Sequence, residues 1–267
     1  MQTTAGKGYL MKNKILGYSI FLSVIICMTF LSGCATSLQN RERASTHVNM
    51  GTAYLKSGHF SPALREFLEA QRFSPSDPEI RYYTGLSYYR IGMKEEAKRE
   101  FKKALSIKPD YSEANNYMGT IYLEEGLYDK AIEKFDLALS NVFYETPAKA
   151  LNNIGLAYYK KGDYKTALIK YESALKREPD TITLLLIQKN MGIACLAKHD
   201  IDKAVFHLER AIDMAPGMIE LRYWLGISYL EKGNREKAVE EFRAVIETNL
   251  ESVFGLKARE QLDYISP

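Results

Sequence analysis

Residues 112–140 read SEANNYMGTIYLEEGLYDKAIEKFDLALS and contain the pattern on which the fold depends. Gly119 is followed three residues later by Tyr122, and Ala131 is followed four residues later by Phe135. Residues three or four apart share one face of an α-helix. The stretch therefore predicts two antiparallel helices that meet through small and aromatic residues.

The same pattern occurs six times, at intervals of about 34 residues. The recurring glycines are Gly51, Gly85, Gly119, Gly155, Gly192 and Gly226. The recurring alanines are Ala63, Ala97, Ala131, Ala167, Ala204 and Ala238. The large residues four positions after these alanines are Phe67, Phe101, Phe135, Tyr171, Leu208 and Phe242.

This pattern is similar to that of the tetratricopeptide repeat (TPR) family. The resemblance implies an all-α, right-handed superhelical solenoid of six repeats over residues 44–250, because one repeat cannot bury its apolar face without neighbours. Extra residues are expected in the connections around Asn141–Pro147 and Asp180–Leu185. Residues 251–267 predict a C-terminal capping helix.

The first 33 residues have the features of an export signal. Lys12 and Lys14 precede an apolar run from Ile15 to Leu31, and residues 31–34 read LSGC, which resembles the bacterial lipobox. The resemblance implies cleavage before Cys34 and lipidation of that residue. Residues 1–10 are interpreted as a start-site overrun, because Met11 begins a complete signal. The alternative is an uncleaved membrane anchor.

The predicted mature chain begins with a lipidated linker, residues 34–43. Ala35 follows the modified cysteine, and by similarity to lipoprotein sorting in Gram-negative bacteria this implies the periplasmic face of the outer membrane. A Gram-negative source is assumed. Cys27 would leave with the signal and Cys34 would be lipidated, so Cys195 would remain alone and form no internal disulfide.

The composition indicates a folded body without affinity for nucleic acid. Hydrophobic residues make up 46% and charged residues 26%, and the net charge of +3 comes from 36 basic and 33 acidic residues. Three of the lysines lie in the predicted signal, so the repeats carry a balanced charge. Binding to nucleic acid depends on neutralising phosphates, and the sequence offers no basic surface for it.

The sequence offers no candidate catalytic group, metal site or cofactor site. His47, His59, His199 and His207 lack the spacing of metal ligands and are expected on helix surfaces. Residues 162–166, GDYKT, lack the glycine and lysine pattern of a phosphate loop. The alternation of Glu and Lys is typical of solvated helix faces. We therefore expect a protein that is not an enzyme.

In the TPR family the first helix of each repeat lines a groove that binds protein segments. When the groove positions of the family are transferred to this sequence, the resemblance implies a groove with fifteen lining residues. They are Val48, Thr52, Leu55, Tyr82, Leu86, Tyr89, Asn116, Leu123, Asn152, Tyr159, Ile193, Leu196, Tyr223, Ile227 and Leu230. Such a groove suits an extended segment or an amphipathic helix, with Asn116 and Asn152 bonding a peptide backbone. Val48 and Thr52 stand where a clamp for carboxylate tails would need Lys or Asn, so a chaperone-tail receptor is not expected.

A lipobox followed by six repeats resembles the type IV pilus biogenesis and stability lipoproteins, or pilotins. The resemblance is sharpest at residues 144–155, YETPAKALNNIG. It implies a non-catalytic protein that binds the pilus secretin and promotes its outer-membrane localisation and multimerisation. The alternative is a periplasmic adaptor that recruits peptidoglycan hydrolases or other envelope-assembly proteins. Neither function involves a small-molecule substrate.

The lipobox leads to a prediction for Cys34→Ser. This variant should fold but should be mislocalised, because it lacks the residue that receives the lipid. Fractionation of the cell envelope together with helical circular dichroism measures both properties. Normal recovery of the variant in the outer membrane would refute the lipid anchor.

Overall fold

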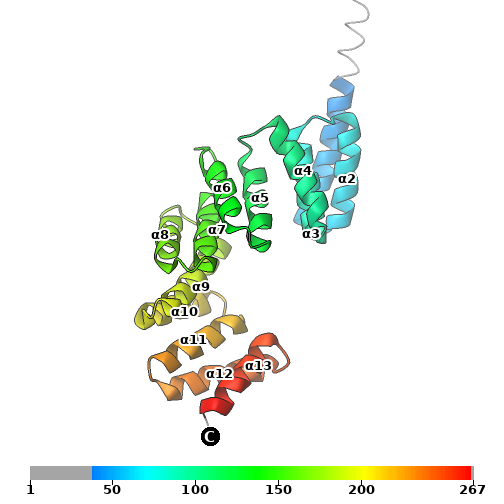
Figure 1. Ribbon diagram of the computed structural model, residues 1–267. Helices are drawn as coiled ribbons and strands as arrows, with labels where there is room; N and C mark the ends of the chain where they lie inside the picture. Colours follow the sequence, from blue (N-terminus) through cyan, green and yellow to red (C-terminus); the bar gives the residue numbers. More distant parts are fainter. Residues whose placement is uncertain (1–37, 266–267) are drawn as a thin grey trace, which may run out of the picture. The chain divides into compact units, whose positions relative to one another are not determined.

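The computed structural model describes residues 38–265, where the regular elements are α-helices and no strand occurs (Figure 1). The predicted signal and Cys34 lie outside these residues. The helices form two compact units, one ending at Ile107 and the other beginning at Lys108.

The first unit holds two helix pairs. A helix over residues 38–56 pairs with α2 (Phe60–Phe73), and α3 (Pro78–Ile91) pairs with α4 (Lys94–Ile107). The expected linker, residues 34–43, is therefore helical from residue 38 onward. Ala44, the first residue of the predicted repeats, is already buried against Ala70 and Ile80.

The second unit continues the same alternation and ends with a single helix. Its elements are α5 (Ser112–Glu124), α6 (Tyr128–Leu139), α7 (Pro147–Lys160), α8 (Tyr164–Leu175), α9 (Thr181–Ala197), α10 (Ile201–Met214), α11 (Ile219–Glu231), α12 (Arg235–Asn249) and α13 (Val253–Ile265). The extra residues before α7 form a connection, as expected. Those before α9 instead extend that helix, which spans 17 residues.

Each repeat is held together by direct contact between its glycine and the large side chain of the second helix. A Cβ atom on Gly119 would lie 2.7 Å from the Phe135 ring, and one on Gly155 would lie 2.5 Å from the Tyr171 ring. The other four repeats show the same approach, with Leu208 replacing the ring in the fifth. The pattern of Gly and aromatic residues is therefore a steric requirement: the two helices cross too closely for any side chain at this glycine.

The turn inside each repeat has a left-handed residue. Gly58, Gly92, Gly126, Gly162 and Gly233 have positive φ angles between 75° and 95°. His199 takes the corresponding place in the fifth repeat with a φ of 60°, a conformation that costs a residue with a Cβ more than glycine.

Four repeats have a polar pair, 19 residues apart in sequence, that joins their two helices. The pairs are His47 with Glu66 at 2.7 Å, Arg81 with Glu100 at 2.9 Å, Gln188 with His207 at 2.7 Å and Arg222 with Glu241 at 3.0 Å. His47 and His207 are thus half-buried partners, which corrects the expectation that they lie on helix surfaces. His59 and His199 are exposed, in turns between helices.

The pair of Arg81 and Glu100 belongs to a wider network. Arg81 also donates to the Gln71 side chain and to the Pro75 carbonyl, and Lys103 donates to Glu100 at 2.7 Å. Burial raises the pKa of Glu100, but the hydrogen bonds and charges of Lys103 and Arg81 outweigh this effect and hold it below its ordinary value. The carboxylate therefore remains ionised and bound between two cations.

The final helix, α13, confirms the expected cap. Phe254 packs against Tyr223 of α11 with ring centroids 5.4 Å apart, and Ala258 is fully buried. Glu260, 34 residues after Gly226, replaces the glycine that a further second helix would require, and it is exposed together with Asp263. One face of α13 covers the last repeat, and its exposed side carries Glu260 and Asp263 together with Leu256 and Tyr264.

The close contact at Gly119 predicts the effect of Gly119→Ala. The added methyl group should destabilise the chain by about 2 kcal/mol, because overpacking a buried site outweighs the better helix propensity of alanine. Urea unfolding followed by circular dichroism measures the change. Gly217→Ala is the matched control, because nothing lies within 4 Å of a Cβ there. Equal stability of the two variants would contradict the steric role of Gly119.

The buried hydroxyl group of Tyr171 leads to the prediction that its removal stabilises the chain. Its hydroxyl is buried without a hydrogen-bond partner among the described residues, and burial raises its pKa. Tyr171→Phe removes the unpaired hydroxyl and should stabilise the chain by about 1 kcal/mol in the same urea measurement. Loss of stability would mean that the hydroxyl has a partner in solution.

Candidate functional site

The predicted groove residues lie on the first helices of the repeats and none is fully exposed. Tyr82, Asn116, Asn152 and Tyr223 are buried, with exposed fractions of 9%, 2%, 4% and 8%. These four occupy the fifth position of their repeats. The other predicted residues are half-buried: Val48, Thr52, Leu55, Leu86, Tyr89, Leu123, Tyr159, Ile193, Leu196, Ile227 and Leu230.

In the first unit a hollow of about 680 Å³ opens beside Val48. It lies between the helix over residues 38–56 and the connection that leads into α3. Ala44, Val48 and Ile80 give it an apolar part, while Arg41 and Glu79 add charges of both signs. This combination suits a protein segment better than a small anionic or cationic ligand.

The connection beside this hollow is fixed by the start of α3. The Asp77 carboxylate accepts hydrogen bonds from the backbone N–H groups of Glu79 and Ile80, at 2.8 and 3.3 Å, and Pro78 begins the helix. These are the usual features of a stable helix N-terminus. The wall of the hollow is therefore formed before any partner arrives.

In the second unit, polar side chains join successive first helices directly. Asn190 of α9 donates to the Asn152 side-chain oxygen of α7 at 3.0 Å, and Lys189 of α9 pairs with Glu220 of α11 at 3.2 Å. The Asn152 oxygen thus already has a partner inside the chain. The expectation that Asn152 bonds a peptide backbone stays a prediction, and any such bond has to form beside the one to Asn190.

Three further predicted residues belong to the packing of the repeats. Tyr223 contacts the Phe242 and Phe254 rings, and the Tyr82 ring lies 6.0 Å from that of Phe101. Asn116 is buried and its side-chain oxygen has no partner among the described residues. Tyr82, Asn116, Asn152 and Tyr223 are therefore buried in the repeat packing, whereas Val48 and the residues at the ninth and twelfth positions are half-buried and better placed to meet a partner.

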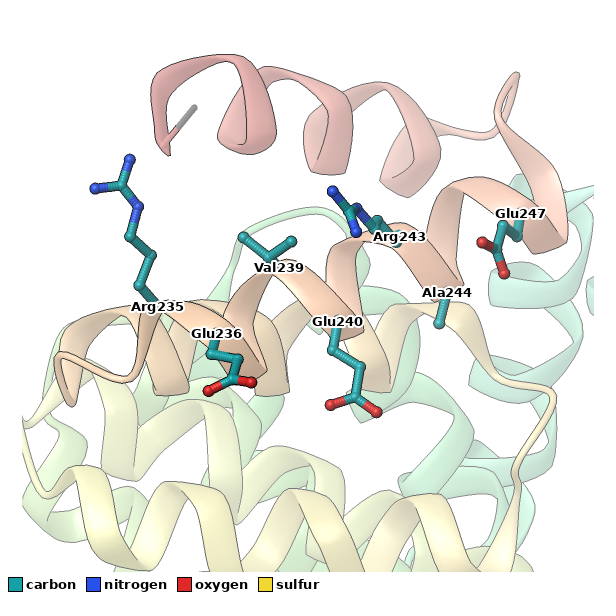
Figure 2. Close-up of a pocket in the computed structure, with 7 residues that line it drawn as sticks. All are labelled: Arg235, Glu236, Val239, Glu240, Arg243, Ala244 and Glu247. Carbon is teal, nitrogen blue, oxygen red and sulfur yellow. The ribbon is translucent and has the colours of Figure 1, made fainter. Parts of the chain in front are cut away.

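Two other hollows lie in the second unit. The larger, of about 890 Å³, is lined by α12 alone, and Figure 2 shows Arg235, Val239 and Arg243 on the side toward α13 and Glu236 and Glu240 on the other side. The smaller, of about 300 Å³, lies between Leu230, Arg235 and the end of α13. The charged groups of the α12 surface diverge, so they provide no convergent set for a small ligand.

The described residues give little opportunity for catalytic chemistry. No group of three or more His, Cys, Asp or Glu side chains among them could hold a metal ion. Cys195 is buried and reduced, and burial raises the pKa of its thiol to about 11, far from the range of a reactive thiolate. No helix within residues 38–265 is both long and apolar enough to cross a membrane.

Sequence reasoning missed Asn190 and the polar pairs because they do not belong to the Gly, Ala and aromatic pattern. Asn190 follows Lys189, which occupies the fifth position of its repeat, and only the packing of α7 against α9 brings it to Asn152. The constant interval of 19 residues between paired polar side chains is a signal that could have been found.

Two pilus proteins of known structure are similar to this chain. PilW, described as a widely conserved type IV pilus biogenesis factor, aligns with a TM-score of 0.74 and 18% identity over 81% of this chain and 98% of its own. PilF of Pseudomonas aeruginosa aligns with a TM-score of 0.72 and 14% identity, over 84% and 99%. At these identities the likeness establishes the fold alone.

A relative from another system is more similar in sequence over a shorter stretch. The photosystem I assembly protein Ycf3 of Prochlorococcus marinus is 33% identical over 79 residues, which are 30% of this chain and 46% of that protein. The match thus spans about half the length of this relative.

Family models described as tetratricopeptide repeat match residues 78–111, 110–180, 146–217 and 196–260. Together they cover an unbroken stretch of more than half of the 267 residues. The chain therefore belongs to the tetratricopeptide repeat family.

Proposed function

We propose that this protein is a non-catalytic, lipid-anchored scaffold of the outer membrane that supports type IV pilus biogenesis. It binds the secretin and promotes its localisation and multimerisation. The observation that carries the proposal is the alignment of PilW and PilF over 98% and 99% of their own lengths. The lipobox at residues 31–34 supports the same conclusion, because a pilotin must reach the membrane in which the secretin is inserted.

The short distance between the anchor and the first helix is consistent with this role. Residues 35–37 are all that separate Cys34 from the helix that is formed from residue 38. Three residues can span at most about 10 Å. The first repeat would therefore act close to the membrane surface, where a secretin ring inserts.

The first unit offers the better binding surface. Its hollow beside Val48 is open and partly apolar, and Leu86 and Tyr89 are half-buried on α3. The hollows of the second unit instead lie on α12 and beside the end of α13, away from its predicted groove residues except Leu230. The secretin segment is therefore assigned to the first helices of the first unit.

A general envelope-assembly adaptor is the second candidate function. The match to Ycf3 favours it, because that relative has the higher sequence identity and is named for the assembly of photosystem I. The adaptor would share the anchor and the repeats but would bind peptidoglycan hydrolases or other assembly proteins.

Affinity capture separates the two functions. The tagged, lipidated chain is used to capture partners from native envelopes, and partners are identified by mass spectrometry against the Cys34→Ser chain. Recovery of a secretin supports the pilus role. Recovery of cell-wall hydrolases without a secretin would replace it with the adaptor.

The assignment to the first unit predicts the effect of Leu86→Glu combined with Tyr89→Glu. Partner binding should weaken about tenfold or more, because a carboxylate is costly to bury in an apolar contact. Helical circular dichroism should be retained. The matched control is Ile169→Glu with Phe206→Glu, which makes the same change at two residues that are 51% and 52% exposed on α8 and α10. Equal loss in both double variants would move the binding surface away from α3.

A further inference from the structure

The connection between α6 and α7 presents two large apolar side chains to solvent. Val142 and Phe143 are each 87% exposed, the highest fractions among the large hydrophobic residues of the described chain. Neighbouring exposed residues of this size are costly to keep in water. The connection is also the site of the extra residues that lengthen this repeat, so the core of the repeat does not require them.

The connection is an ordered turn. The Asn141 side-chain oxygen accepts a hydrogen bond from the Phe143 backbone N–H at 3.0 Å, and the Tyr144 N–H donates to the Asn141 carbonyl at 3.1 Å. Tyr144 itself is only 6% exposed and packs with Phe135, Ala138 and Ile154. The turn is thus fixed from both sides, and Val142 and Phe143 project without a conformational change.

A third apolar side chain lies on the neighbouring connection. Ile182, at the start of α9, is 73% exposed. Asp180 of that connection interacts electrostatically with Lys149 near the start of α7, and α7 packs against α9. The exposed residues Val142, Phe143 and Ile182 therefore belong to one edge of the second unit, called here the apolar edge.

The charges near the apolar edge show no excess of cations. The cations Lys149, Lys176 and Arg177 are offset by the carboxylates of Glu145, Glu178 and Asp180, and Glu113 acts electrostatically on Tyr144 of the same turn. An edge of this kind has no net attraction for an anionic surface. Any surface that it meets must be recognised by its apolar side chains.

We propose that the apolar edge inserts Val142 and Phe143 into the interfacial region of a lipid bilayer. A projecting turn needs no matching pocket in lipid, whereas a protein partner would have to provide one. Two side chains alone bind weakly, but a chain anchored at Cys34 is held at the membrane, which raises the effective concentration of the edge. The inference uses the lipid anchor of the proposed function and does not depend on the secretin.

Tryptophan fluorescence in vesicles tests this insertion. The full lipidated chain carrying Phe143→Trp is reconstituted in phosphatidylcholine vesicles, with and without phospholipids brominated on the upper part of the acyl chain. The native chain, which has a single tryptophan at position 224, is the blank. Lys165→Trp is the matched control, because it lies near the opposite turn, between α7 and α8, and is also exposed.

The expected result is a shift of the added fluorescence to shorter wavelength and strong quenching by the brominated lipid for Phe143→Trp. Lys165→Trp should show neither. The quenching should persist at high salt and should not increase with anionic lipid, because the edge has no excess of cations. Val142→Trp should behave like Phe143→Trp and provides a second reporter if the first variant loses helicity.

Three results would overturn the proposal. Quenching of Phe143→Trp no greater than that of Lys165→Trp would show that the edge stays in water. Quenching that requires anionic lipid and low salt would show that the cations Lys149, Lys176 and Arg177, and not the apolar side chains, hold the edge at the membrane. A wavelength shift that appears in native envelopes but not in protein-free vesicles would assign the edge to a protein partner. Each result leaves the binding of the secretin to the first unit unaffected.

Discussion

The structure depends on the contact between a glycine of each first helix and the large side chain of the second. In all six repeats a Cβ at this glycine would lie within 2.8 Å of the facing side chain. That distance is shorter than van der Waals contact, so the crossing of the two helices exists only because the side chain is absent. The alanines at the same crossing, such as Ala97 and Ala131, are fully buried for the same reason. Each repeat thus forms its own core, and stacking buries the remaining apolar faces.

Much of the fold could be predicted because this contact imposes residue types at fixed intervals. Gly119 with Phe135 and Gly226 with Phe242 mark the same crossing in different repeats, and the spacing alone places the helices. Features that do not depend on the contact between glycine and the large side chain were not predicted. The first helix is already formed at residue 38, before the predicted repeats, and α9 takes up the extra residues at its start.

The candidate site was harder to predict than the fold, because position in a repeat does not determine burial. The fifth position was expected to line a groove, but Asn152 is bonded to Asn190 and Tyr223 is covered by Phe254 of the cap. Asn190 lies on the following first helix and Phe254 on the cap, and neither contact follows from the repeat pattern. The histidines show the same limit: His47 and His207 gain partners, Glu66 and Gln188, only when the helices of one repeat pair. What remains open is the hollow beside Val48, between the first described helix and the connection into α3.

In-cell photocrosslinking tests most directly the central functional claim, that a secretin binds the first unit. A photoreactive amino acid is introduced at Thr52, a half-buried residue of the first helix, and in a second chain at Ile169 on the outer face of α8. The account predicts an adduct with the secretin from position 52 and none from position 169. An adduct from position 169 alone, or adducts from position 52 that contain no secretin, would contradict it.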